Sequence, residues 1–148
     1  MTVFFVAAHI AFARFEPMLS SKQMADTLMA KGSPNDTVII YGEQSSGSSL
    51  IFYTNDFFGG RPALLVIPRC GQHGEGSTLL WGSCYPDAPD IYMSDHTLAG
   101  IWGAGERKWI FAEDPDRDKV ERTLAGSGHL YAVETLADKT LWTDRPLP

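Results

Sequence analysis

The stretch at 37–54 constrains the fold more than any other part of the sequence. It opens with a short, nearly continuous apolar run, which is typical of a strand buried on both faces. Residues 42–49 are Gly, Ser, Glu and Gln, a composition that predicts a loop. The next apolar run, 50–54, follows Ser48 and Ser49, which can cap a short helix. A strand, a Gly/Ser loop and a helix in this order form the unit from which an open α/β sheet is built.

The composition is that of one ordinary globular domain. The chain has 148 residues, of which 44% are hydrophobic and 20% charged, and such a chain can bury about 70% of the surface that its unfolded form exposes. The formal net charge of −6 argues against a nucleic-acid partner, because the phosphate backbone requires a positive protein surface. It also disfavours a peripheral grip on anionic lipid, which relies on clusters of Lys and Arg.

The run from Val3 to Phe15 does not fit a plain soluble domain. It is apolar except for His9 and Arg14, but it is too short to cross a bilayer by itself, since a spanning helix needs about 20 apolar residues. A secretory signal peptide would begin with positive charge, and none precedes this run. The residues alone leave two interpretations open: a buried or interfacial helix, or the last turns of a transmembrane helix.

Strands alternate with helices along the rest of the chain. After the first strand, further strands are predicted at 63–67, 108–113, 129–135 and 139–143. Helices are predicted to begin at Ser20, where Gln23 completes a capping box, at Ser94 or Asp95, and at Asp114, which a proline follows. Residues 69–89 give no clear prediction. The alternation implies a mostly parallel sheet, and the last two strands imply an antiparallel edge hairpin.

One segment after the first strand is a candidate ligand-binding loop, because ligands on such sheets bind beyond the carboxyl ends of the strands. We call it the Gly/Ser segment; it consists of Gly42, Glu43, Gln44, Ser45, Ser46, Gly47 and Ser48. Its glycine spacing is that of a P-loop, but Ser48 stands where the phosphate-binding Lys is required, and Glu43 would repel phosphate. We therefore expect no nucleotide there. The segment is either a tight connection or the site of a small-molecule binding module.

Two cysteines, Cys70 and Cys84, allow one disulfide, which we expect if the domain faces an oxidising compartment; two free thiols are the alternative. Together with His73 and His96 they offer zinc ligands, but their spacing is not that of a usual zinc site, so no metal site is predicted. The acids at 113–118 coincide with a helix N-terminus, where the helix dipole favours them. No Ser, His and acid have the spacing of a catalytic triad, so no catalytic residue is predicted.

Several motifs occur in a fixed order along the chain. They are Phe15 to Lys22, Val38 to Tyr53, Leu80-Trp81-Gly82-Ser83, Pro86-Asp87-Ala88-Pro89, Leu98 and Trp102 with the strand at 109–111, and the ending Leu141 to Leu147. In order and spacing they resemble the segment that follows the final membrane helix of bacterial polytopic glycosyltransferases. That family is related to the aminoarabinose transferases and protein O-mannosyltransferases, which take sugars from polyprenyl phosphate. The resemblance covers nearly the whole chain, although no single motif is diagnostic.

The resemblance implies a three-layer α/β/α architecture for a soluble domain at residues 16–148, with residues 1–15 as the tail of a transmembrane helix. It further implies the C-terminal periplasmic domain of a membrane glycosyltransferase that uses a polyprenyl-phosphate-linked sugar donor. Its partners would be the membrane-embedded helical part of the same enzyme, which it would cap, and the lipid-linked sugar. In the family the catalytic acids lie on loops between early membrane helices, so the domain is not expected to be catalytic alone or to hold a cofactor.

Two other functions compete with this expectation. The first is an independent α/β module that binds a small molecule through the Gly/Ser segment. The second is a free-standing enzyme that uses Asp87, Asp90 or His96. The chain also departs from the family at one position: it has Asp144 where the family often has Asn before the final Arg-Pro.

Overall fold

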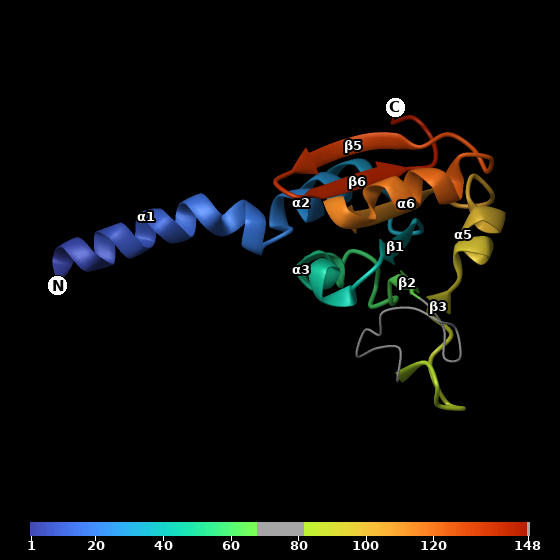
Figure 1. Ribbon diagram of the computed structural model, residues 1–148, viewed down its shortest axis with the longest axis horizontal. Coiled ribbons are helices and arrows are strands. Elements are labelled where there is room, and N and C mark those ends of the chain that lie inside the picture. The colour runs from blue at the N-terminus through green and yellow to red at the C-terminus, as the bar shows by residue number, and fades with distance from the viewer. Residues whose placement is uncertain (68–81, 148) are drawn as a thin grey trace.

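The structure, a computed structural model, describes residues 1–67 and 82–147. Its centre is a six-stranded sheet (Figure 1). The strands are β1 (Thr37–Tyr41), β2 (Leu64–Val66), β3 (Tyr92–Met93), β4 (Lys108–Glu113), β5 (Tyr131–Leu136) and β6 (Lys139–Thr143), in the spatial order β3-β2-β1-β4-β6-β5. The first four strands in this order are parallel, whereas β6 runs antiparallel to both β4 and β5. The predicted mostly parallel sheet and its antiparallel edge hairpin are both confirmed.

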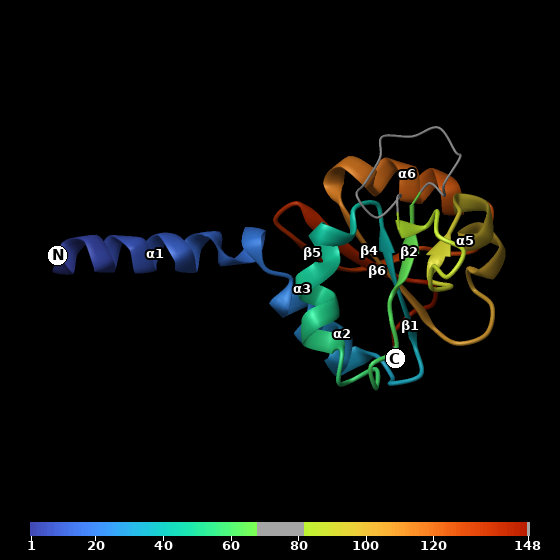
Figure 2. The same cartoon turned by 90° about the horizontal axis from the view of Figure 1, so that it is seen from below.

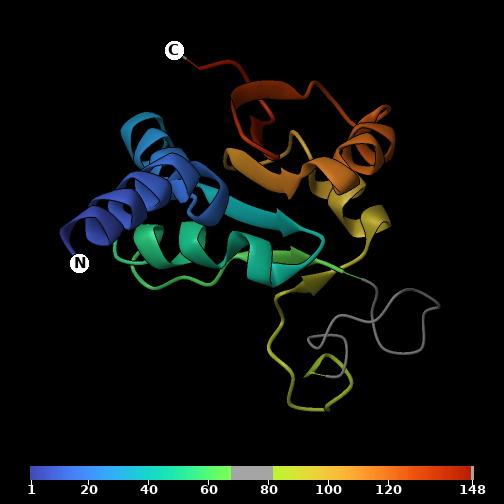
Figure 3. The same cartoon turned by 60° about the vertical axis from the view of Figure 1, so that its left-hand side comes forward.

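Helices cover both faces of the sheet and make three layers (Figures 2 and 3). They are α2 (Lys22–Lys31) and α3 (Gln44–Thr54) on one face, and α5 (Asp95–Ile101) and α6 (Asp114–Leu124) on the other. Successive side chains of a strand point to opposite faces. Val38 and Ile40 therefore join the core under α2 and α3, while Ile39 and Tyr41 join the core under α5 and α6. The predicted α/β/α architecture is confirmed.

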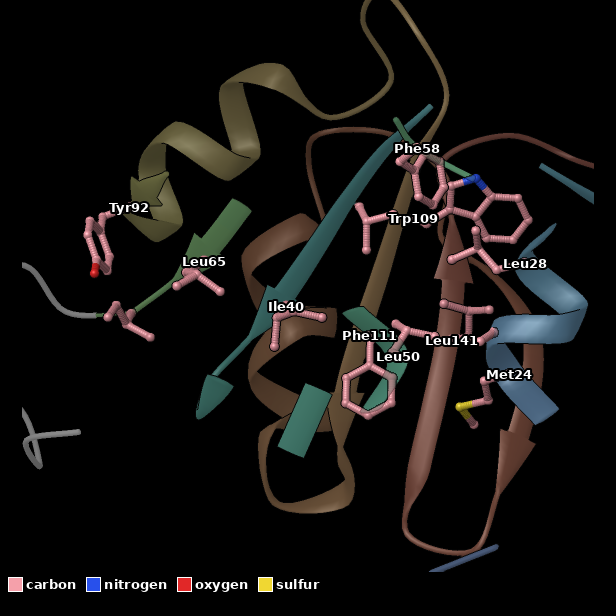
Figure 4. Packing of buried hydrophobic residues seen from close by; sticks show 13 residues of the cluster. Met24, Leu28, Ile40, Leu50, Phe58, Leu65, Tyr92, Trp109, Phe111 and Leu141 are labelled. Carbon is pink, nitrogen blue, oxygen red and sulfur yellow. The ribbon is translucent and has the colours of Figure 1, made fainter. Parts of the chain in front are cut away.

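Trp109 lies at one end of the core between the sheet and α2, beside the turn that leads into β1. It is fully buried, and its indole Nε1 donates a hydrogen bond of 2.8 Å to Asp36 Oδ2, which also accepts one from the backbone N of Ser33. Figure 4 shows Trp109 near Leu28 of α2 and Phe58. One side chain therefore connects the central strand β4, the helix α2 and the turn that leads into β1.

The capping box predicted at Ser20 and Gln23 is wrong. Helix α1 (Thr2–Leu19) continues up to Ser20, so Ser20 ends one helix and Ser21 takes the N-cap position of the next. The Gln23 amide donates instead to Glu134 Oε1 of β5, at 2.8 Å. The prediction at Ser94 is confirmed, because its hydroxyl accepts a hydrogen bond from the backbone N of Thr97. Strand β3 was not predicted; it is two residues long and follows the region that gave no clear prediction.

Helix α1 projects away from the rest of the chain (Figures 1 and 2). Its large apolar side chains are exposed on all sides: Val3 is 83% exposed, Phe4 71%, Phe5 62% and Phe12 70%. The clusters of buried side chains described here begin at Met24 and include no residue of α1. Within residues 1–67 and 82–147, no helix combines the length and the hydropathy that a bilayer crossing requires.

Candidate functional site

The chain changes direction across the sheet between β1 and β4. From β1 it passes through α3 to β2 and onward to β3, and then returns through α5 to β4 on the other side of β1. Ligands of open α/β sheets bind at such a switch point, outside the carboxyl ends of the two strands. In this chain β1 ends at Tyr41 and is followed by Gly42, and β4 ends at Glu113.

The Gly/Ser segment lies at this switch point, but most of it is helical. Helix α3 begins at Gln44, with Glu43 as its N-cap residue, and not after the serines at 48 and 49 as predicted. The serine hydroxyls bond within the helix: Ser46 Oγ donates to the Glu43 carbonyl at 2.7 Å, and Ser48 Oγ to the Ser45 carbonyl at 2.8 Å. The predicted boundary between loop and helix is therefore wrong, while ligand binding by the segment stays a prediction.

Gly47 permits close packing of α3 on β1. A Cβ atom added at Gly47 would lie 2.7 Å from Ile40 Cδ1 and 2.9 Å from Ile40 Cγ2, and both residues are buried. Such distances force the helix or the isoleucine to move. The glycine is thus a packing residue, facing the sheet, and cannot contact a ligand on the outer side of α3.

We expect Gly47→Ala to lower the free energy of unfolding by about 1 kcal/mol, since overpacking outweighs the gain in helix propensity. The matched control is Gly100→Ala in α5, where an added Cβ meets nothing within 4 Å. That variant should be stabilised by about 0.5 kcal/mol from propensity alone. Urea unfolding of both variants measures the difference, and equal stability of the two would refute the packing role.

Gly42 and Tyr41 belong to the side of the switch point that faces α5 and α6. Gly42 has φ +88°, and a Cβ at this position would overlap the Asp116 carboxylate. Tyr41 Oη donates a 2.6 Å hydrogen bond to Asp95 Oδ1. Burial and this bond raise the pKa of the Tyr41 hydroxyl, and burial also raises the pKa of the Asp116 carboxyl, which Lys119 lowers in part. These groups support the strand end and the start of α6.

A pocket lies on the other side, where α1 ends against α3. We call it the corner pocket; its volume is about 300 Å³, and it is lined by Met18, Leu19, Ser45, Ser46, Ser48, Ser49, Glu113 and Lys139. Three residues of the predicted Gly/Ser segment, the serines at 45, 46 and 48, are thus brought together with residues from α1, β4 and β6. Gly42 and Gly47 do not line it.

Lys139 and Glu113 supply the charges of the corner pocket. Lys139 is only 4% exposed, and its Nζ donates a 2.7 Å hydrogen bond to the Met18 carbonyl at the end of α1. Burial raises the pKa of the Glu113 carboxyl, the charge of Asp138 raises it further, and Lys139 lowers it. A pocket with one ammonium group, one carboxyl group and serine oxygens can hold a polar ligand by hydrogen bonds. No sequence pattern indicates the role of Lys139, which lies 91 residues after Ser48.

Because the folded state raises the pKa of Glu113, folded protein binds this proton more tightly than unfolded protein does. The contribution of Glu113 to stability therefore falls as the pH rises from about 4, the ordinary pKa of glutamate, and stays lost above the raised pKa. We expect Glu113→Gln to be at least as stable as the parent chain at pH 7, with a smaller loss of stability between pH 4 and 7. Asp138→Asn should change the profile in the same direction by less. Unfolding in urea at several pH values measures this, and an unchanged profile would contradict it.

Other predicted residues lie elsewhere. Asp87, Asp90 and His96 are exposed and do not line the corner pocket. Asp144 is buried, and its Oδ1 accepts hydrogen bonds from the backbone N of Lys108 and from Arg145. It therefore fastens the end of the chain to β4, which is a structural role.

Of the four candidate disulfide and zinc residues, Cys84 and His96 belong to the described part of the chain. Cys70 and His73 lie outside the described residues, so the disulfide between Cys70 and Cys84 stays a prediction. Among the described residues, no group of three or more His, Cys, Asp or Glu side chains is arranged to hold a metal ion.

The sequence matches no protein-family model and no curated protein. Two solved structures share its fold. One is a crystal structure of ArnT from Cupriavidus metallidurans in the apo state, with a TM-score of 0.60 and 17% identity. The other is ArnT from the same organism bound to undecaprenyl phosphate, with a TM-score of 0.57 and 18% identity. Each alignment covers 88% of this chain and 20% of the longer chain, so this chain corresponds to about a fifth of those proteins.

Proposed function

We propose that this chain is the C-terminal extracytoplasmic domain of a membrane glycosyltransferase that uses a polyprenyl-phosphate-linked sugar. The domain caps the membrane-embedded helical part of the same enzyme and is not catalytic alone. The observation that carries the proposal is the shared fold, which extends over 88% of this chain and only a fifth of the ArnT chain. A unit with that share of a transferase is a domain of the larger enzyme.

Helix α1 supports attachment to a membrane. A helix that is apolar on all sides has no face suited to water and must be covered by lipid or protein. The large apolar side chains of α1 belong to neither described core and are more than half exposed, from Val3 through Phe15. The simplest cover is the bilayer, with α1 as the end of a transmembrane helix and the domain beginning near Glu16.

The residues of the domain do not by themselves suggest sugar transfer. Among the described residues, the corner pocket holds one acid, Glu113, whose raised pKa suits a proton donor, but no second acid lines it. In the family that the sequence resembles, the catalytic acids lie on membrane loops. We therefore assign the chemistry to the membrane part and a capping role to this domain.

The lining of the corner pocket supports a contact with the head group of a lipid-linked sugar. It is lined by the last residues of α1, so in a membrane-attached chain it would lie next to the bilayer surface. Lys139 Nζ and the oxygens of Ser45 and Ser48 are groups that hydrogen-bond phosphate or sugar hydroxyls. The pocket would thereby help to admit the lipid-linked donor or the acceptor.

The size and location of the native protein test this proposal. An antibody raised against residues 16–147 should detect, in the membrane fraction of the source cells, a polypeptide several times longer than 148 residues. Protease is added to the outside of spheroplasts, which expose the extracytoplasmic face, and of inverted inner-membrane vesicles, which expose the cytoplasmic face. It should remove the epitope only from the spheroplasts. A short polypeptide in the aqueous fraction would refute the proposal and leave the small-molecule binding module as the function.

A further inference from the structure

The outer face of α3 carries exposed aromatic side chains that no other part of the described chain covers. Phe52 is 76% exposed and Tyr53 40% exposed, and their rings meet edge to face at 5.3 Å. On the same helix Ser45 and Ser48 are exposed, whereas the opposite face, formed by Gly47, Leu50 and Thr54, is buried against the sheet. The exposed face is therefore polar at its start and aromatic at its end.

This face looks toward the region into which α1 projects. In Figures 1 and 2, α3 lies on the side of the domain from which α1 leaves, and α3 runs across the direction of α1. If α1 follows the membrane normal, α3 lies parallel to the membrane plane, on the bilayer side of the domain beside the start of α2 and the β5–β6 turn.

The apolar surface of α1 and the outer face of α3 are continuous. Met18 and Leu19 line a groove of about 480 Å³ along α1, which is otherwise formed by Phe4, Ala8, Ala11, Phe12 and Phe15. The same two residues line the corner pocket together with Ser45 and Ser48 of α3. The hydrogen bond from Lys139 Nζ to the Met18 carbonyl holds this junction to β6. A bilayer that covers α1 therefore first meets the serine-rich start of α3 at the corner pocket, and the aromatic end of the same helix face follows.

The chemistry of the face suits the interfacial layer of a bilayer. Aromatic rings with a polar atom, such as Tyr53, gather at the level of the lipid head groups, and lysines extend their ammonium groups toward water beside them. Lys22 Nζ lies 5.9 Å from the centre of the Tyr53 ring and pairs with Asp26. With a net charge of −6, attraction to anionic lipid cannot drive the contact, so insertion of the aromatic rings into a neutral bilayer must do so.

We infer that α3 lies flat on the bilayer, with Phe52 and Tyr53 inserted at the level of the head groups and the corner pocket open to the lipid surface. This inference rests on the proposed membrane attachment through α1. In this arrangement α3 fixes the orientation of the domain relative to the membrane. A second contact beside α1 prevents the domain from rotating about the end of that helix.

Hydroxyl-radical labelling of the full chain in phosphatidylcholine nanodiscs tests the inference. The internal control is Tyr85, which is 67% exposed and belongs to a segment on the side of the domain away from α1 (Figures 1 and 2). The labelling rates of Phe52 and Tyr85 are each normalised to the rate in the urea-unfolded chain. Insertion of an interfacial helix to the acyl boundary should make Phe52 react about fivefold more slowly than Tyr85.

The α1 phenylalanines separate failure of this inference from failure of the proposed function. If Phe4 and Phe12 are protected while Phe52 reacts like Tyr85, α1 is in the membrane and α3 is not, which overturns the inference alone. If Phe4 and Phe12 are labelled as well, the membrane attachment itself is refuted. Protection of Phe52 that disappears when each disc holds a single chain would identify a second copy as the partner and would also overturn the inference.

Discussion

Trp109→Ala is expected to lower the free energy of unfolding by about 3–5 kcal/mol. Trp109 is fully buried, so its removal leaves a large cavity between β4 and α2. It also removes the donor at 2.8 Å from Asp36 Oδ2, a carboxylate that is itself buried. Since domains of this kind are stable by about 5–15 kcal/mol, this loss is a large fraction of the total stability.

Two further variants separate packing from hydrogen bonding at this position. Trp109→Phe keeps most of the apolar volume and loses the indole N–H, so it should cost about 1–3 kcal/mol, the penalty for a buried acceptor that loses its donor. Phe52→Ala removes an aromatic ring of the exposed surface and should stay within about 0.5 kcal/mol of the parent chain. Urea unfolding in neutral detergent gives all three values. A loss below 1 kcal/mol for Trp109→Ala would contradict its role in connecting β4, α2 and the turn before β1.

Deleting residues 1–15 is expected to abolish self-association of the chain while leaving the fold intact. The removed segment contains the exposed phenylalanines of α1, and neither described cluster of buried side chains includes any of its residues. The deletion retains Met18, whose carbonyl accepts the hydrogen bond from Lys139. The truncated chain should therefore keep the circular dichroism of the domain, apart from the lost helical turns, and should scatter light as a monomer.

The opposite result of the deletion would also be informative. The truncated chain could instead have a free energy of unfolding that is lower by more than about 2 kcal/mol, which is the cost of losing a buried apolar side chain. In that case α1 is a core helix of the domain. The interpretation of α1 as a membrane helix would then lose its main physical support.

The sheet could be predicted from local patterns because its central strands are buried on both faces. The apolar run of β1 and the run that became β4 stand out in the sequence, and the predicted bounds of β4 and β6 agree with the structure. Strand β3 could not be predicted, since two residues carry no periodicity. The start of α3 was missed because Ser and Gly favour loops in isolation. Here Gly47 is helical because α3 packs so closely on Ile40 that only a residue without a side chain fits at this position.

Only the part of the candidate site that belongs to the Gly/Ser segment could be predicted from the sequence. The position of the Gly/Ser segment after β1 pointed to the carboxyl end of the sheet, and Ser45, Ser46 and Ser48 do line a pocket there. Its other walls come from α1, β4 and β6, which are distant in the sequence, and only the folded chain brings Lys139 to Met18. The acids at the start of α6 were correctly attributed to helix structure, since Asp114 and Asp116 occupy its first turn.

Flotation with lipid vesicles tests membrane attachment through α1 most directly. The full chain, mixed with neutral phosphatidylcholine vesicles and centrifuged through a density gradient, is predicted to rise with the lipid. Phe5→Asp/Phe12→Asp places two charges on α1 at side chains that are 62% and 70% exposed, and should leave the protein at the bottom. Tyr85→Asp, at a side chain that is 67% exposed outside α1, should float like the parent chain. A parent chain that stays at the bottom, or an α1 variant that floats equally well, would contradict the account.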